Sequence, residues 1–71
     1  MRQLLGKMSV KHQHFTEVYL SEQVRCHDCQ RMVPMGIEVV IVRKEGEARK
    51  VIKRRCYCRT HGNSIAADVL S

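Results

Sequence analysis

Four residues of this chain have the types and the spacing of ligands for a single metal ion. Cys26 and Cys29 are separated by two residues, and Cys58 and His61 repeat this spacing further along the chain. Thiolate and imidazole groups arranged as C-x-x-C and C-x-x-H pairs favour zinc in a closed tetrahedral site. The sequence therefore predicts one structural Zn²⁺ ion bound by these four side chains.

A further cysteine, Cys56, leaves an alternative for the third ligand. Cys56 and Cys58 form a C-x-C pair, whose side chains lie well apart if the segment is extended. We favour Cys58 because its two-residue separation from His61 bends naturally around one ion. Cys56 is then a small, partly buried apolar residue, although a site built from Cys56 and His61 stays open as the alternative.

The cysteines also allow an interpretation as two disulfide bonds. The start of the chain, residues 1–7, has no long apolar stretch of the kind found in secretory signals. The longest apolar run, residues 39–42, is far too short to span a bilayer. We therefore expect a reducing, cytoplasmic setting, no membrane partner, and metal ligation in place of disulfides.

Composition explains why this chain would need a metal to fold. Its 71 residues fit one domain, and aromatic residues make up only 4% of them. Ordering each residue costs about 1.5 kcal/mol, and a small core offsets little more than that. A structural zinc site contributes about 10–16 kcal/mol, so we expect zinc to determine whether the chain folds.

Hydrophobic periodicity predicts the elements that position the ligands. Residues 1–13 show no strong period and are expected to form a loosely ordered arm, followed by a single zinc-binding domain over residues 14–71. Alternation and β-branched residues predict strands over residues 14–20, 37–43 and 48–57.

The expected connections follow from turn-forming residues. Residues 21–23 are predicted to link the first strand to the metal-binding turn, and Pro34 and Gly36 to interrupt the chain before the next strand. Glu45–Gly46 is the predicted hairpin turn. Helical spacing predicts a short helix over residues 64–70, capped by Asn63 or Ser64.

This order of turn, hairpin, second ligand pair and helix resembles a treble-clef zinc finger over about residues 24–70. The resemblance implies a small α+β zinc-binding fold, here with an additional N-terminal strand. It places Cys26 and Cys29 in the zinc knuckle, and Cys58 and His61 where the hairpin runs into the terminal helix. One departure is Gln30 after the second cysteine, where the family often has glycine.

A second departure is Gly62, which directly follows His61 and is expected to delay the start of the helix. Neither departure removes the four predicted ligands.

The charge excess lies in one segment. Residues 43–59 contain eight basic and two acidic residues, which account for the whole formal net charge of +6. Clustered Lys and Arg bind phosphates with a salt-dependent affinity, and an aromatic ring nearby can stack on a base. We therefore expect nucleic-acid binding through this segment. The candidate residues are Arg43, Lys44, Arg49, Lys50, Lys53, Arg54, Arg55, Tyr57 and Arg59.

A protein-interaction adaptor is the alternative function. A small basic protein can dock on an acidic surface of a larger transcription or translation machine, and the arm over residues 1–13, with Leu4, Leu5 and Met8, would be a natural docking segment. The strand over residues 37–43 is apolar on both faces, so a partner or a second copy would cover the face that the helix leaves free. Monomer and homodimer are both compatible with the sequence.

An enzymatic role is not expected. Four ligands would close the metal site, whereas catalytic zinc keeps one position open. No carboxylate stands at the spacing of a general base beside an open metal position, so no catalytic residue is predicted.

Overall fold

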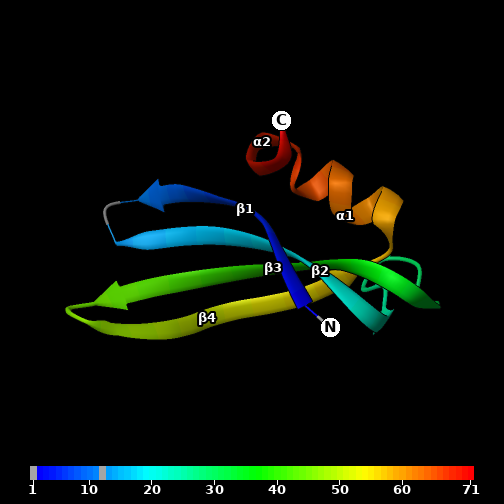
Figure 1. Cartoon of the computed structure of the whole chain (residues 1–71), viewed down its shortest axis with the longest axis horizontal. Helices are drawn as coiled ribbons and strands as arrows, with labels where there is room; N and C mark the ends of the chain where they lie inside the picture. The colour runs from blue at the N-terminus through cyan, green and yellow to red at the C-terminus, as the bar shows by residue number, and fades with distance from the viewer. Residues whose placement is uncertain (1, 12) are drawn as a thin grey trace.

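The computed structural model describes residues 2–11 and 13–71. Their strands form one antiparallel sheet in the order β1-β2-β3-β4, and two short helices follow. Figure 1 shows both helices on the same side of the sheet. The elements are β1 (Arg2–Lys11), β2 (His14–Arg25), β3 (Met32–Glu45), β4 (Ala48–Tyr57), α1 (Arg59–Ile65) and α2 (Ala67–Leu70). Within the described ranges, neither helix has the length and apolar character needed to cross a membrane.

The N-terminal segment differs from the loosely ordered arm that its sequence predicted. Arg2–Lys11 forms β1, an edge strand that pairs antiparallel with β2. Two register shifts interrupt the pairing, the first between Leu4 and Gly6, and such irregularities erase the alternating pattern from which a strand is predicted. Met1 and His12, which also belong to the expected arm, lie outside the described residues.

β2 and β3 are longer than the pattern predicted. β2 continues through residues 21–23, the expected connection, and β3 includes both Pro34 and Gly36. Glu22 pairs with Met35 and Val24 pairs with Val33, so Gln23 and Pro34, which lie between these pairs, are opposite each other. Gln23 has φ 53 at this irregularity, and the missing N–H of Pro34 is tolerated because the ladder is already interrupted there.

The β3–β4 hairpin closes one residue later than expected. Glu45 pairs with Ala48, so the turn residues are Gly46 and Glu47. Gly46 has φ +61, a conformation that only glycine adopts without a steric penalty. The bounds of β4, Ala48–Tyr57, are those that the sequence predicted.

The helices pack on what we call the helix-side face of the sheet. Its core consists of Val18, Ile37 and Ala66, which are buried against one another. Partly buried neighbours of this cluster are Leu20, Val39, Val69 and Leu70. This packing brings the start of α1 close to the end of the sheet where the turn over residues 26–31 connects β2 to β3.

The helix begins earlier than expected. α1 starts at Arg59 with Cys58 as its N-cap, so Asn63 and Ser64 lie inside it and cannot act as caps. Gly62 also lies inside α1 and does not delay it. A Cβ at this position would lie 2.7 Å and 2.9 Å from Cγ1 and Cγ2 of Ile37, so glycine is what permits the close approach of α1 to β3.

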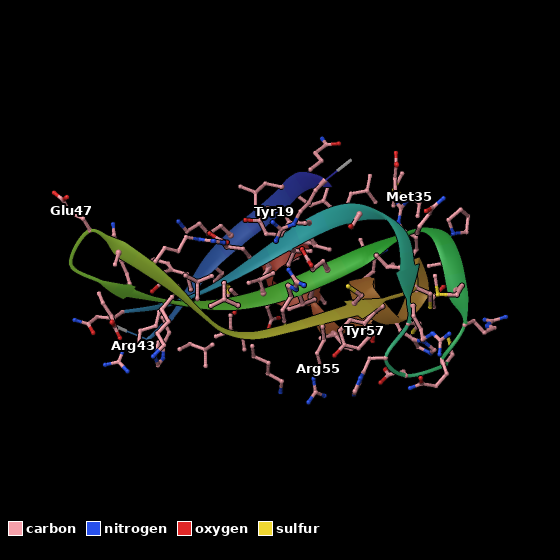
Figure 2. The ribbon with its side chains drawn as sticks, turned by 90° about the horizontal axis from the view of Figure 1, so that it is seen from below. Tyr19, Met35, Arg43, Glu47, Arg55 and Tyr57 are labelled. Carbon is pink, nitrogen blue, oxygen red and sulfur yellow. The ribbon has the colours of Figure 1, made fainter. Side chains whose placement is uncertain are left out.

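We call the opposite face of the sheet, which lies away from α1 and α2, the open face. Its buried apolar residues are covered by side chains of the sheet itself. Val40 and Val42 of β3 are 0% and 3% exposed there, and Glu17 and Glu38 beside them are also buried. The two carboxylates form ion pairs with Arg2, Lys7, Arg49 and Arg54. Figure 2 looks onto this face and its long polar side chains, with Tyr19 among them and Glu47 at the hairpin tip. The cover that was expected from a partner or second copy is therefore intramolecular.

Candidate metal centre

Cys26, Cys29, Cys58 and His61 converge as their spacing predicted. Their ligand atoms all lie within 4.8 Å of one another. Nδ1 of His61 is 3.4 Å from Sγ of Cys26 and 3.3 Å from Sγ of Cys58. Zinc bonds of about 2.3 Å to sulfur and about 2.0–2.1 Å to nitrogen would place tetrahedral ligand atoms roughly 3.5–3.8 Å apart. The four side chains can therefore bind one metal ion with little rearrangement.

The turn between β2 and β3 positions the first ligand pair. The backbone N–H of Cys26 donates to the carbonyl of Arg31, and the carbonyl of Cys26 accepts from the N–H of Gln30, both at 2.9 Å. Gln30 has φ 62, the left-handed conformation for which a treble-clef knuckle often uses glycine. The Gln30 side chain donates to the carbonyl of His27 at 2.6 Å, a local bond that helps to hold this conformation.

The junction of β4 and α1 positions the second pair. β4 ends at Tyr57 and α1 begins at Arg59, so Cys58 is the N-cap and His61 lies in the first turn. Residues three apart in a helix lie on the same side, and this aligns Cys58 with His61. The backbone N–H of His27 donates to the carbonyl of Cys56 at 2.8 Å and ties the two halves of the site together.

Cys56 lies outside this cluster. It pairs with Glu38 across the β3–β4 ladder, on the open face, whereas α1 and His61 lie on the other side of the sheet. Burial raises the pKa of the Cys56 thiol, and the negative charge of Glu38 raises it further. The structure therefore brings Cys58, and not Cys56, to the other three candidate ligands.

Local hydrogen bonding favours the thiolate forms of Cys26 and Cys29. Burial alone would raise the pKa of Cys26, but hydrogen bonds from the backbone of Cys29 and Cys58 and the contact with His61 lower it to about 5. The backbone N–H of Cys29 lies 3.4 Å from Sγ of Cys26. Neighbouring Cys26 and Cys29 also raise the pKa of His61. The pKa of Cys29 is lowered as well, whereas at Cys58 a hydrogen bond from the backbone of His61 is outweighed by burial and by the neighbouring Cys26 and Cys29, which raise the pKa. Because thiolates are the form that ligates metal, Cys26 and Cys29 are the two ligands that the local electrostatics prepare for a cation.

The expected nucleic-acid-binding residues divide between the two faces of the hairpin. Cross-strand pairing places Lys53, Arg55 and Tyr57 opposite Ile41, Val39 and Ile37, on the helix-side face. Lys50 pairs with Arg43 and shares this face. Lys44, Arg49 and Arg54 point to the open face. Arg59 is exposed in the first turn of α1.

Carboxylates engage three of these cations. Arg49 pairs with Glu17, and Arg54 lies 3.3 Å from Glu38. Arg43 lies 3.3 Å from Glu45. Within the described ranges, no carboxylate pairs with the remaining five cations, which are Lys44, Lys50, Lys53, Arg55 and Arg59.

Tyr57 does not present an exposed ring for stacking. Its exposed fraction is 6%, and its ring packs edge-to-face against His27 with 6.0 Å between the centroids. Tyr57 therefore packs beside the turn over residues 26–31, which carries the candidate ligands Cys26 and Cys29.

Sequence reasoning missed the two buried carboxylates of the open face. Glu17 accepts hydrogen bonds from Arg49 and from the hydroxyl of Tyr19, the latter at 2.8 Å. Burial would raise the pKa of Glu17, but these bonds and the charge of Arg49 outweigh burial and lower it. The sequence feature that could have indicated these buried carboxylates is a single acidic residue within an apolar strand, such as Glu38 between Ile37 and Val39.

Comparison of the chain with models of protein families, with curated proteins and with solved structures gave no match. The class of molecule is therefore defined by its own fold and site. It is a small domain with a four-stranded antiparallel sheet, short C-terminal helices and a Cys₃His cluster that can hold a metal ion.

Proposed function

We propose that the chain is a zinc-stabilised binding module of the treble-clef type, with no enzymatic activity, that acts in the cytoplasm. Three thiolates and one imidazole form a donor set that suits zinc, and four protein ligands fill its tetrahedral coordination. The treble-clef part of the proposal is supported by the order of the elements, because the candidate ligands come from a turn before the β3–β4 hairpin and from the helix start after it. Zinc bound there supplies stability and leaves no open position for a reacting group.

The ligand of this module is nucleic acid, bound through its phosphates. The observation that carries this proposal is the unequal neutralisation of the two faces. On the open face, Arg49 and Arg54 are paired with buried carboxylates. On the helix-side face, Lys50, Lys53 and Arg55 follow one another along β4 without a carboxylate partner among the described residues. Such a row of uncompensated cations attracts a polyanion.

Charge reversal on opposite faces tests this proposal. Lys53→Glu changes the helix-side face, whereas Lys44→Glu makes the same change of net charge on the open face of the same hairpin. Both lysines are exposed, so neither variant should alter folding. We expect Lys53→Glu to weaken oligonucleotide binding about tenfold and to reduce the slope of log affinity against log salt by about one. Lys44→Glu should have a clearly smaller effect.

The result that contradicts nucleic-acid binding is an affinity that does not fall with salt in fluorescence anisotropy. Equal losses from the two lysine variants would instead contradict the assignment to the helix-side face, because they would report net charge alone.

A protein-interaction adaptor is the second candidate, and one observation favours it. Leu4, Leu5 and Met8 are exposed along β1, an edge strand of the sheet. An edge strand with exposed apolar side chains can accept a strand from a partner. Capture of partners from the source cells with and without nuclease separates the candidates, because a protein partner bound at β1 would survive nuclease and be lost in a Leu5→Lys variant.

A further inference from the structure

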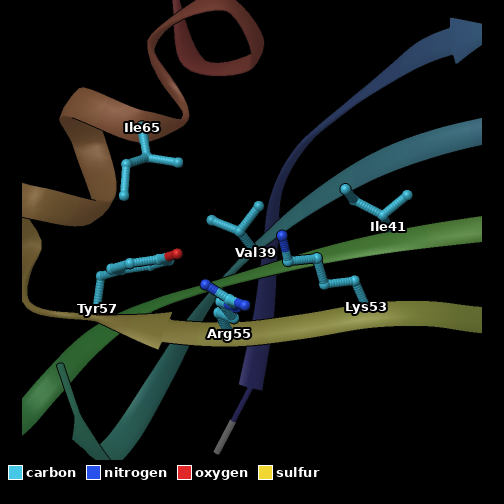
Figure 3. Close-up of a pocket in the computed structure, with 6 residues that line it drawn as sticks. All are labelled: Val39, Ile41, Lys53, Arg55, Tyr57 and Ile65. Carbon is cyan, nitrogen blue, oxygen red and sulfur yellow. The ribbon is translucent and has the colours of Figure 1, made fainter. Parts of the chain in front are cut away.

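A groove opens on the helix-side face between α1 and β4 (Figure 3). Its volume is about 110 Å³. The lining residues are Val39, Ile41, Lys53, Arg55, Tyr57 and Ile65. In Figure 3, Ile65 reaches toward the groove from α1, and Lys53 and Arg55 rise from β4 beside Val39. The groove thus combines aliphatic surfaces with two cationic side chains.

The size of the groove restricts what can enter. Pockets for whole small-molecule ligands usually measure about 300–1,000 Å³, several times the volume of this one. One flat ring or one side chain can enter it. An occupant is therefore a single group that belongs to a larger molecule bound along the surface.

The charges beside the groove restrict the chemistry of that larger molecule. Nη1 of Arg55 lies 2.9 Å from Nε2 of His27. A guanidinium only donates hydrogen bonds, so this nitrogen of His27 accepts through its lone pair and does not neutralise the charge. Lys53 has no carboxylate partner among the described residues. The groove is therefore suited to a group with an apolar surface and negative charge close to it.

We propose that this groove holds one unpaired base of a single-stranded nucleic acid, with the flanking phosphates on Lys53 and Arg55. This inference rests on the proposed function and specifies the form of nucleic acid that is bound. A base has apolar faces, which Val39, Ile41 and Ile65 can contact, and a phosphate on either side. The row of cations continues along β4 to Lys50, so the phosphate backbone can follow the strand beyond the groove.

Single strands are favoured because a base in a duplex is paired and stacked and cannot enter a groove of this size. Tyr57 acts here as an end wall, since its ring is held against His27 and is almost fully buried. The base contacts are therefore mainly aliphatic.

Two isoleucines provide a matched test. Ile65 lines the groove and is 49% exposed, and Ile52 of β4 does not line it and is 50% exposed. We would compare Ile65→Ser with Ile52→Ser by fluorescence anisotropy, on a single strand of about 12 nucleotides, its duplex, and an abasic strand of the same length. Polyglutamate serves as the acidic polypeptide probe. Metal content and the urea midpoint establish that each variant is folded.

We expect the single strand to bind about tenfold more tightly than the duplex or the abasic strand, from the burial of the apolar faces of one base against aliphatic side chains. Ile65→Ser should remove most of this difference, and Ile52→Ser should leave it within about twofold. The abasic comparison uses the unmodified chain and so tests the inference even if Ile65→Ser does not fold.

Equal binding of all three nucleic acids would overturn the inference and leave phosphate binding intact. Failure to bind any of them would refute the proposed function itself. Polyglutamate binding as tightly as the single strand, and sensitive to Ile65→Ser, would overturn the inference in favour of an acidic peptide.

Discussion

Replacing Gly62 by alanine tests how closely α1 packs on the sheet. Helix propensity alone predicts that Gly62→Ala stabilises the protein by up to about 1 kcal/mol. The structure predicts the opposite sign, because the new Cβ would lie 2.7 Å and 2.9 Å from Cγ1 and Cγ2 of Ile37. Ile37 is fully buried at the centre of the core and cannot turn away.

The expected change in the free energy of unfolding is the difference between these two opposing effects. Overpacking a close-packed core costs about 1–3 kcal/mol, and contacts below 3.0 Å call for the upper part of that range. After the gain in helix propensity, we expect the free energy of unfolding to fall by about 1–2 kcal/mol. Because His61 precedes Gly62, a displaced α1 should also weaken zinc affinity.

Urea unfolding at saturating zinc measures this change, with Ser64→Ala as the control. Ser64 is exposed on the same helix, so its replacement should be neutral or slightly stabilising. An unchanged or higher urea midpoint for Gly62→Ala, with no loss of zinc affinity, would refute the packing argument.

Three further changes follow from the same structure. Native mass spectrometry should find one zinc ion bound to Cys56→Ser and none bound to Cys58→Ser. The reverse result would show that Cys56, and not Cys58, is the third cysteine ligand. Burial opposes ionisation of Glu17, but hydrogen bonds lower its pKa below 4.5, so its carboxylate stabilises the fold above that pH and the effect is lost as pH falls through the lowered pKa. The difference in urea midpoint between Glu17→Gln and the unmodified chain should therefore shrink toward acidic pH, and a constant difference would argue against this ion pair. A Cβ at Gly36 would lie 2.5 Å from the carbonyl oxygen of Tyr57, so Gly36→Ala should lower the urea midpoint by the equivalent of about 2 kcal/mol or more, whereas wild-type stability would show that β3 can shift there.

The sequence predicted those features that depend on local pattern. The C-x-x-C and C-x-x-H spacing identified four residues that converge in the structure, because a short turn and the first turn of a helix each bring ligands three positions apart to one side. The bounds of β4 followed from the alternation that ends at Tyr57. Gln30 stands where treble-clef sequences often have glycine, and it adopts the left-handed conformation that this position requires.

Features that depend on tertiary contacts were not predictable in the same way. β1 forms because β2 offers it a pairing edge, and its two register shifts hide the strand pattern. In the sequence, Gly62 predicts a weak or delayed helix. In the structure it allows α1 to pack closely on Ile37, a residue far away in the sequence.

Simple alternation along β4 would place Arg49 on the face of Lys53 and Lys50 on the face of Arg54. The register shift between Ile41 and Val42 exchanges the faces of Arg49 and Lys50, and buried Glu17 and Glu38 neutralise part of the open face. The linear charge pattern shows neither the register shift nor these ion pairs.

The central claim is that one zinc ion is held by Cys26, Cys29, Cys58 and His61. X-ray absorption at the zinc edge, on the purified unmodified chain, tests it most directly. We predict one zinc per chain, with three sulfur neighbours at about 2.3 Å and one nitrogen neighbour at about 2.0–2.1 Å. A chain that is folded without metal, or a zinc surrounded by four sulfur atoms, would contradict the account.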